Sequence, residues 1–132
     1  MTPARRQPQQ AQDLQQQKEE MEDILRQVGD YVSRLSEGCT LVRENFQQGD
    51  HALGQKRLSE MLEGLGWVTK AFAVSRPLLQ ERRIELALDG LPDALQPALE
   101  GLQNQDFGLV GDVLEYEVQP ILQEWRLELE KL

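Results

Sequence analysis

LQQQKEEMEDILRQVGDYVSRLSEGCTLVRENF, residues 14–46, sets the architecture of this chain. Apolar side chains recur there at alternating spacings of four and three residues, and Lys18 is the exception. An α-helix brings such positions onto one face, so the stretch predicts one long amphipathic helix whose apolar seam packs on other helices. The seam positions are Leu14, Lys18, Met21, Leu25, Val28, Val32, Leu35, Cys39, Val42 and Phe46.

The sequence around this stretch divides into a lead-in and one domain. Residues 1–12 are rich in Gln and Pro and are expected to form a flexible lead-in. Residues 13–132 are expected to form a single helical bundle domain, because no segment shows the alternating pattern of a strand. The predicted fold class is all-α, an up-and-down bundle of four main helices whose first helix, from about Asp13 to Gln48, is long.

Turn and capping residues mark the other helices. Gly49 is expected to end the first helix and Asp50 to cap the second, which covers about 51–74. The third helix is expected from about Pro77 to Leu88 and is broken near Pro92, resuming to about Gln103.

The last predicted helix runs from about Phe107 to Lys131, and Asp106 is its expected cap. Pro120 lies inside its apolar pattern, which continues on both sides. We therefore expect a kink at Pro120 and not an end of the helix.

Charge and cysteine content limit the partners and the location. The formal net charge is −9, and an acidic surface argues against binding nucleic acid or an anionic membrane and favours a basic partner or simple solubility. Cys39 is the single cysteine and lies on the apolar seam, which indicates a core residue. No apolar run approaches the roughly 20 residues of a membrane span, and no signal peptide is evident, so we expect a cytoplasmic protein.

The residues that enzymes use are sparse. His51 is the sole histidine, and one histidine with one distant cysteine supports neither thiol catalysis nor a zinc site. No glycine-rich phosphate loop or serine nucleophile motif is present. We expect no enzymatic activity, no cofactor and no small-molecule substrate.

Paired carboxylates allow an alternative interpretation, in which the protein is an enzyme. Glu60 with Glu63 and Asp112 with Glu115 could hold Mg²⁺ between facing helices, as in all-helical nucleotide pyrophosphatases. Helix phase argues against this, because these residues lie about 80° to 200° away from the apolar stripes of their helices.

Unequal helix lengths suggest where binding occurs. The first helix is about 50 Å long and the second and last are about 36–38 Å, so its first turns would overhang the bundle. Leu14, Met21, Ile24 and Leu25 would then need a partner, either another protein or a second copy in a homodimer through this helix. The alternative is that a bend or the third helix covers them.

Two aromatic residues lie opposite their apolar stripes. Trp67, with Val74 on the same side of its helix, is either buried between two neighbours or an exposed anchor for a partner. Tyr116, near Asp112 and Glu115, is either an ordinary exposed side chain or part of an acidic face for a basic partner.

Two sequence blocks carry a resemblance. Residues 106–117, DFGLVGDVLEYE, followed by PILQEW at 120–125, resemble the C-terminal block of a family of small uncharacterised bacterial helical proteins. Residues 46–50 and 62–67 are similar to the middle of that family. In size and helical plan the chain also resembles flagellar export chaperones, which hold a helix of a partner. The expected role is a non-catalytic interaction module, an adaptor or a chaperone-like bundle.

Overall fold

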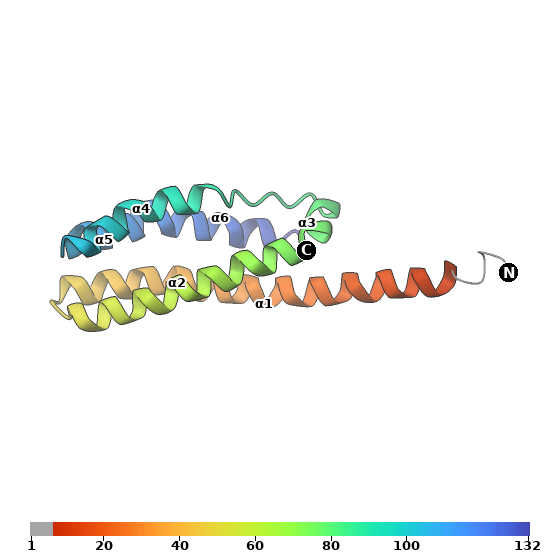
Figure 1. The fold of residues 1–132 in the computed structure, drawn as a ribbon, viewed down its shortest axis with the longest axis horizontal. Helices are drawn as coiled ribbons and strands as arrows, with labels where there is room; N and C mark the ends of the chain where they lie inside the picture. The colour runs from red at the N-terminus through yellow and green to blue at the C-terminus, as the bar shows by residue number, and fades with distance from the viewer. Residues whose placement is uncertain (1–6) are drawn as a thin grey trace.

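The computed structural model describes residues 7–132, which form an up-and-down bundle of helices with no strand in that range. Its four rods are α1, α2, α3 with α4, and a last rod in which α5, η2 and α6 follow one another, and neighbouring rods run in opposite directions (Figure 1). The predicted all-α fold with a long first helix is confirmed. The elements are α1 (Gln7–Gln47), α2 (His51–Val74), α3 (Arg76–Glu81), α4 (Gly90–Gln103), α5 (Phe107–Val113), the π-helix η2 (Leu114–Val118) and α6 (Gln119–Leu129).

The first helix is longer than expected. It has 41 residues and a length of about 60 Å, and its N-terminal part projects beyond the other rods (Figure 1). Residues 7–12, expected to precede it, are helical, since Gln and Ala favour helices and nothing there ends one. The remainder of the expected lead-in, residues 1–6, lies outside the described residues.

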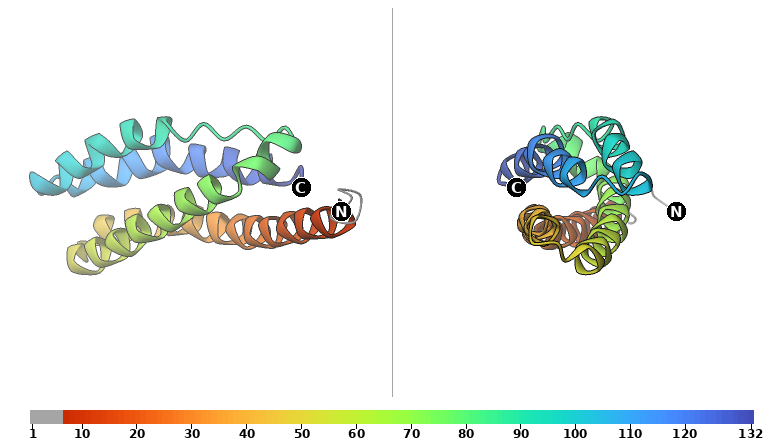
Figure 2. Two further views of the ribbon diagram at one scale, coloured as in Figure 1. Left: turned by 45° about the vertical axis from the view of Figure 1, so that its right-hand side comes forward. Right: turned by 90° about the vertical axis from the view of Figure 1, so that its left-hand side faces the viewer.

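The core is built around α1. From Leu25 to Phe46 every seam position of α1 is buried, and α1 packs against α2, α3, α5, η2 and α6. Seen end-on, α1 and α2 form one layer and α4 to α6 the other (Figure 2). Phe72 of α2 and Trp125 of α6 join the layers through an edge-to-face contact with ring centroids 5.5 Å apart. Burial of this seam is the main driving force for the bundle.

Three of the predicted helix ends are confirmed in detail. Gly49 has a φ of +82°, the left-handed conformation that glycine adopts without strain, and so ends α1. The Asp50 carboxylate accepts a hydrogen bond from the Leu53 backbone N–H at 3.3 Å and caps α2, which covers the predicted residues. Asp106 caps α5 in the same way, through the Leu109 N–H at 3.2 Å.

The predicted end of the third helix is wrong. α3 ends at Glu81, where Arg83 adopts a φ of 55° and the Ile84 N–H donates to the Leu79 carbonyl at 2.9 Å. Burial of Ile84 fixes the chain in this non-helical path. The break therefore lies at residues 82–89, and Pro92 falls in the first turn of α4, where proline is tolerated.

The last rod continues through Pro120, as expected. Its departure from α-helical geometry lies just before the proline, in η2, where the Gln119 N–H donates to the Leu114 carbonyl five residues earlier. Pro120 has no N–H to continue the α-helical ladder, and η2 is a single π-turn of the kind that occurs inside longer α-helical runs.

Candidate functional site

Between α1 and α2 a series of hollows is lined mainly by apolar side chains. The two helices run antiparallel and diverge toward α3 (Figure 2). One hollow, of about 240 Å³, is lined by Ile24 of α1 and by Trp67, Lys70, Ala71 and Val74 of α2. A second, of about 500 Å³, shares Ile24 and Val74 with the first, so the two are continuous. Its lining is Leu14, Gln17, Lys18, Glu20, Met21, Ile24, Val74 and Pro77.

A third hollow extends this surface toward the α1–α2 turn. It has a volume of about 270 Å³, and Tyr31 separates it from the first by packing edge-on against Trp67, with ring centroids 5.5 Å apart. We call the three hollows together the α1–α2 groove. The third is lined by Tyr31, Arg34, Leu35, Gly38, Leu41, Arg57, Glu60 and Met61.

Five residues singled out from the sequence meet in this groove. Leu14, Trp67 and Val74 are 59%, 46% and 66% exposed, and Met21 and Ile24 are half-buried. Trp67 and Val74 are seven residues apart, two turns of α2, so they share the side that faces the groove. The first turns of α1 and the C-terminal half of α2 thus form one apolar surface.

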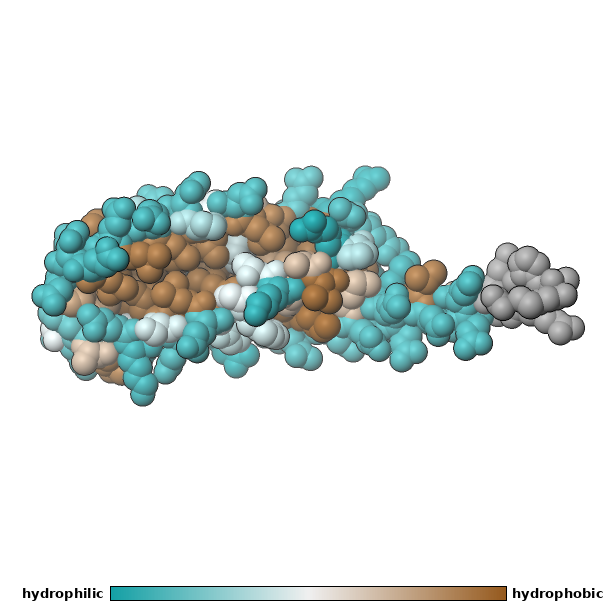
Figure 3. Space-filling model, viewed as in Figure 1, coloured by the Kyte–Doolittle hydropathy of each residue, from teal (hydrophilic) through white to brown (hydrophobic). Residues whose placement is uncertain are grey.

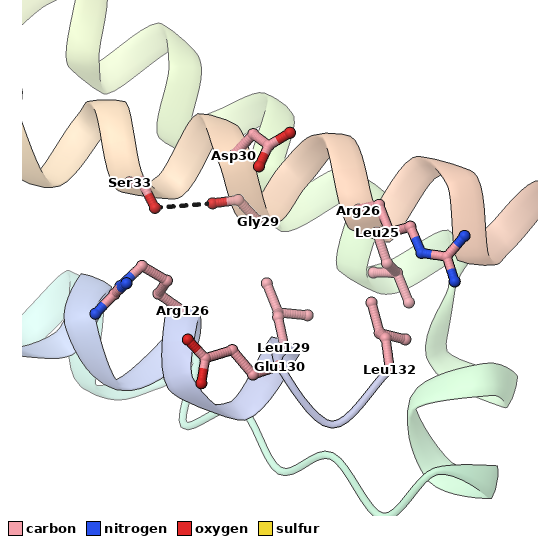
Figure 4. Close-up of a pocket in the computed structure, with 9 residues that line it drawn as sticks. All are labelled: Leu25, Arg26, Gly29, Asp30, Ser33, Arg126, Leu129, Glu130 and Leu132. Atoms are coloured by element: carbon pink, nitrogen blue, oxygen red, sulfur yellow. Dashed lines mark hydrogen bonds between the residues drawn. The ribbon is translucent and has the colours of Figure 1, made fainter.

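Leu25 does not belong to this surface. It is 0% exposed and lies on the side of α1 that faces α6, where Leu129 and Leu132 point toward it (Figure 4). Successive helix residues differ by about 100° in direction, so Leu25 faces the core while its neighbour Ile24 faces the groove. The expectation that Leu25 binds a partner is therefore wrong.

The hollow around Leu25 carries charges of both signs on its rim. Arg26 and Asp30 come from α1, and Arg126 and Glu130 come from the C-terminal rod (Figure 4). Arg26 is already paired with Glu22, one turn earlier. Two positive and two negative side chains give this hollow no preference for a charged ligand.

Tyr116 lies on η2 and not in the groove. It is 66% exposed, and of its expected acidic neighbours Asp112 is exposed whereas Glu115 contacts α1. The Glu115 carboxylate pairs with Arg43 at 2.8 Å, and the Gln119 amide donates to the Ser36 carbonyl at 2.8 Å. The expected acidic face around Tyr116 is therefore partly used to hold the last rod on α1.

The other candidate chemical groups lie apart. Glu60 and Glu63 are exposed on α2, which packs on α1 and α3, whereas Glu115 pairs with Arg43 as described. Among residues 7–132, no three side chains of His, Cys, Asp or Glu gather closely enough to hold a metal ion. Cys39 is buried in the core, and burial raises the pKa of its thiol to about 12.

Tyr31 belongs to the groove without having been predicted from the sequence, and its ring lies over the backbone of α2. A Cβ atom at Gly64 would be 2.1 Å from the Tyr31 hydroxyl oxygen, so the ring reaches Trp67 because residue 64 is glycine. The signal was present in the sequence, since Ile24, Tyr31 and Gly38 are spaced seven apart and mark a second side of α1.

A second apolar surface lies between α2 and α4. Figure 3 shows it as a brown area with a hydrophilic rim, on the face where these two helices flank the bundle. α4 packs on α5 and η2, and α2 packs chiefly on α1, so neither covers the other. On these helices, Leu99 is exposed and Leu62, Leu95 and Leu102 are half-buried.

Comparison with known families identifies the family to which the chain belongs. A family model described as a domain of unknown function (DUF8042) matches residues 23–128, and the chain belongs to this family. The expected membership of an uncharacterised family is thus confirmed. Comparison with curated proteins and with solved structures gives no match. None of the helices between residues 7 and 132 combines the length and apolar character that a membrane crossing needs.

Proposed function

We propose that this member of the DUF8042 family is a non-catalytic protein-interaction module that receives a helix in the α1–α2 groove. The observation that carries the proposal is the convergence of Leu14, Met21, Ile24, Trp67 and Val74 on one partly exposed apolar surface. Apolar grooves between helices are a common receptor for amphipathic helices, which dock through residues spaced three and four apart.

The composition of the groove supports this role. Tryptophan and tyrosine dominate the binding energy of many interfaces, and Trp67 and Tyr31 form the middle of the groove. Methionine adapts its shape to a partner, and the half-buried Met21 lines the groove on the α1 side. Such a surface suits an adaptor or a chaperone-like protein. We also propose that the protein acts in the cytoplasm.

A second copy is the other candidate occupant. Homodimerisation through α1 would bury Leu14, which is exposed among the described residues, and the exposed part of the half-buried Met21. The enzyme alternative would need Glu60, Glu63, Asp112 and Glu115 around one Mg²⁺ ion, and no observation favours that arrangement.

The test is capture of partners by matched variants. Trp67→Asp with Val74→Asp places two charges in the groove, and Leu99→Asp places one on the α2–α4 face. Trp67, Val74 and Leu99 are all exposed, so these variants should fold, which circular dichroism checks. We expect the wild-type protein and Leu99→Asp to retain the same protein from a native extract, and the groove variant to lose it at least about tenfold.

Self-association is measured on the same three proteins by analytical ultracentrifugation. If the groove variant retains every partner of the wild-type protein, and its self-association is unchanged, the proposal is wrong.

A further inference from the structure

The charges along the α1–α2 groove differ from those of the chain as a whole. The chain has 14 basic and 23 acidic residues, but basic residues outnumber acidic ones in the groove lining. The basic lining residues are Lys18, Arg34, Arg57 and Lys70, and the acidic ones are Glu20 and Glu60.

Three of these basic side chains lack a carboxylate partner among the described residues. The Arg34 guanidinium lies over the Tyr31 ring, 5.5 Å from its centroid, and the Arg57 guanidinium donates to the neutral Asn45 side chain at 2.9 Å. Lys70 makes no ion pair within residues 7–132. Lys18 differs, since it pairs with Glu81 at 3.0 Å.

From this arrangement we infer that the occupant of the groove is an amphipathic helix of another protein, whose apolar stripe is flanked by acidic residues. The inference rests on the proposed function and adds the chemical class of the partner. The apolar stripe would pack on Trp67, Tyr31 and Ile24, and the flanking carboxylates would meet Arg34, Arg57 and Lys70. From Leu14 to Leu41 the groove follows about 40 Å of α1, the length of a helix of about 25 residues.

A second copy fits this groove less well. In a symmetric dimer through the first turns of α1, the same segment of both copies meets at the two-fold axis. That segment has four acidic residues in five positions, Glu19, Glu20, Glu22 and Asp23 with Met21 between them. Glu22 pairs with Arg26 and Arg82, but the other three make no ion pair among residues 7–132, and their mutual repulsion opposes such pairing. Between residues 9 and 20 the only large aliphatic side chain is that of Leu14.

The experiment is selection from a display library of helices. Each member is a 25-residue amphipathic helix with a leucine stripe, and each position beside the stripe is either Glu or Lys. The library is selected against the full chain, and binders are kept only if they fail to bind Trp67→Ala, which removes the aromatic anchor without adding a charge. We expect Glu to exceed Lys at the flanking positions by about tenfold, and the excess to shrink as salt is raised.

Two double variants of equal charge change serve as targets for comparison. Arg34→Glu with Lys70→Glu reverses the groove and should abolish the preference for Glu. Arg83→Glu with Arg126→Glu changes exposed residues outside the groove and should leave the preference intact.

The remaining outcomes overturn the inference in distinguishable ways. Trp67-dependent binders with no preference, or with an excess of Lys, would refute the acidic partner and leave the interaction module standing. If no binder depends on Trp67, both the inference and the proposed function fail. A dimer in analytical ultracentrifugation that Trp67→Asp dissociates would show that a second copy occupies the groove.

Discussion

Two glycines of α2 should respond in opposite directions to the same substitution. Gly54 and Gly66 both lie inside the helix, where alanine is intrinsically favoured by about 1 kcal/mol. A Cβ atom at Gly66 meets no atom within 4 Å. A Cβ atom at Gly54 would lie 2.4 Å from Cε1 of Phe46. The local environment therefore decides the sign of the change in stability.

These distances decide which energy terms contribute to each change in stability. Gly66→Ala should stabilise the protein by about 0.5–1 kcal/mol, because only helix propensity changes. Gly54→Ala must displace Phe46, which is buried and packs on Phe107 with ring centroids 5.1 Å apart. Overpacking costs about 1–3 kcal/mol, and so close an approach to Phe46 calls for the upper half of that range. Subtracting the propensity gain of about 1 kcal/mol leaves a net loss of about 1–2 kcal/mol.

Urea unfolding followed by circular dichroism measures both changes. For a slope of about 2 kcal/mol per molar urea, the midpoint should rise by about 0.4 M for Gly66→Ala and fall by 0.5 M or more for Gly54→Ala. If Gly54→Ala is stabilising, Phe46 does not pack against α2 as described. If Gly66→Ala is destabilising in the purified protein, the side of α2 that carries Gly66 is covered and not open as described.

The other predictions concern the core, the thiol and a helix cap. Leu25→Ala should cost about 2–5 kcal/mol in urea unfolding and Leu14→Ala less than about 0.5 kcal/mol, and equal losses would contradict the assignment of Leu25 to the core. Burial raises the pKa of the Cys39 thiol from its ordinary value of 9.0 to about 12 in the folded protein. As the pH rises above 9.0 the thiol therefore ionises in the unfolded chain but not in the folded one, and the free energy of unfolding falls. Between pH 9 and 12 the free energy of unfolding of the wild-type protein should fall by up to about 1.4 kcal/mol per pH unit relative to that of Cys39→Ala. If the two proteins have parallel profiles of stability against pH, burial does not raise the pKa of this thiol. Asp106→Ala removes the α5 cap and should cost about 0.5–2 kcal/mol, whereas Asp106→Asn should retain most of that stability.

Much of the architecture was predictable because local and tertiary signals agree. Gly49 and Asp50 end and begin helices through their own backbone and side-chain chemistry, and the seam from Leu25 to Phe46 is buried as its spacing implies. The end of α3 carries no such signal. Arg83 adopts the left-handed conformation without being glycine, and burial of Ile84, a tertiary effect, holds the chain there.

The groove was predictable in part. Leu14, Trp67 and Val74 stood out because they are large apolar residues on faces that the bundle does not need. Leu25 was misassigned, because a seam position at the start of a helix looks the same whether the bundle covers it or not. The link from Tyr31 to Trp67 depends on the glycine at 64, and a contact between two helices cannot be read from the spacing of one.

The projecting start of α1 has a hydrodynamic consequence. A chain of 15.1 kDa that includes a rod of about 60 Å experiences more frictional drag than a sphere of equal mass. The monomer should therefore leave a gel-filtration column ahead of globular standards of its own size. Removing residues 1–20 should delay its elution by more than the lost mass implies, since the protruding rod and not the bundle sets the apparent radius.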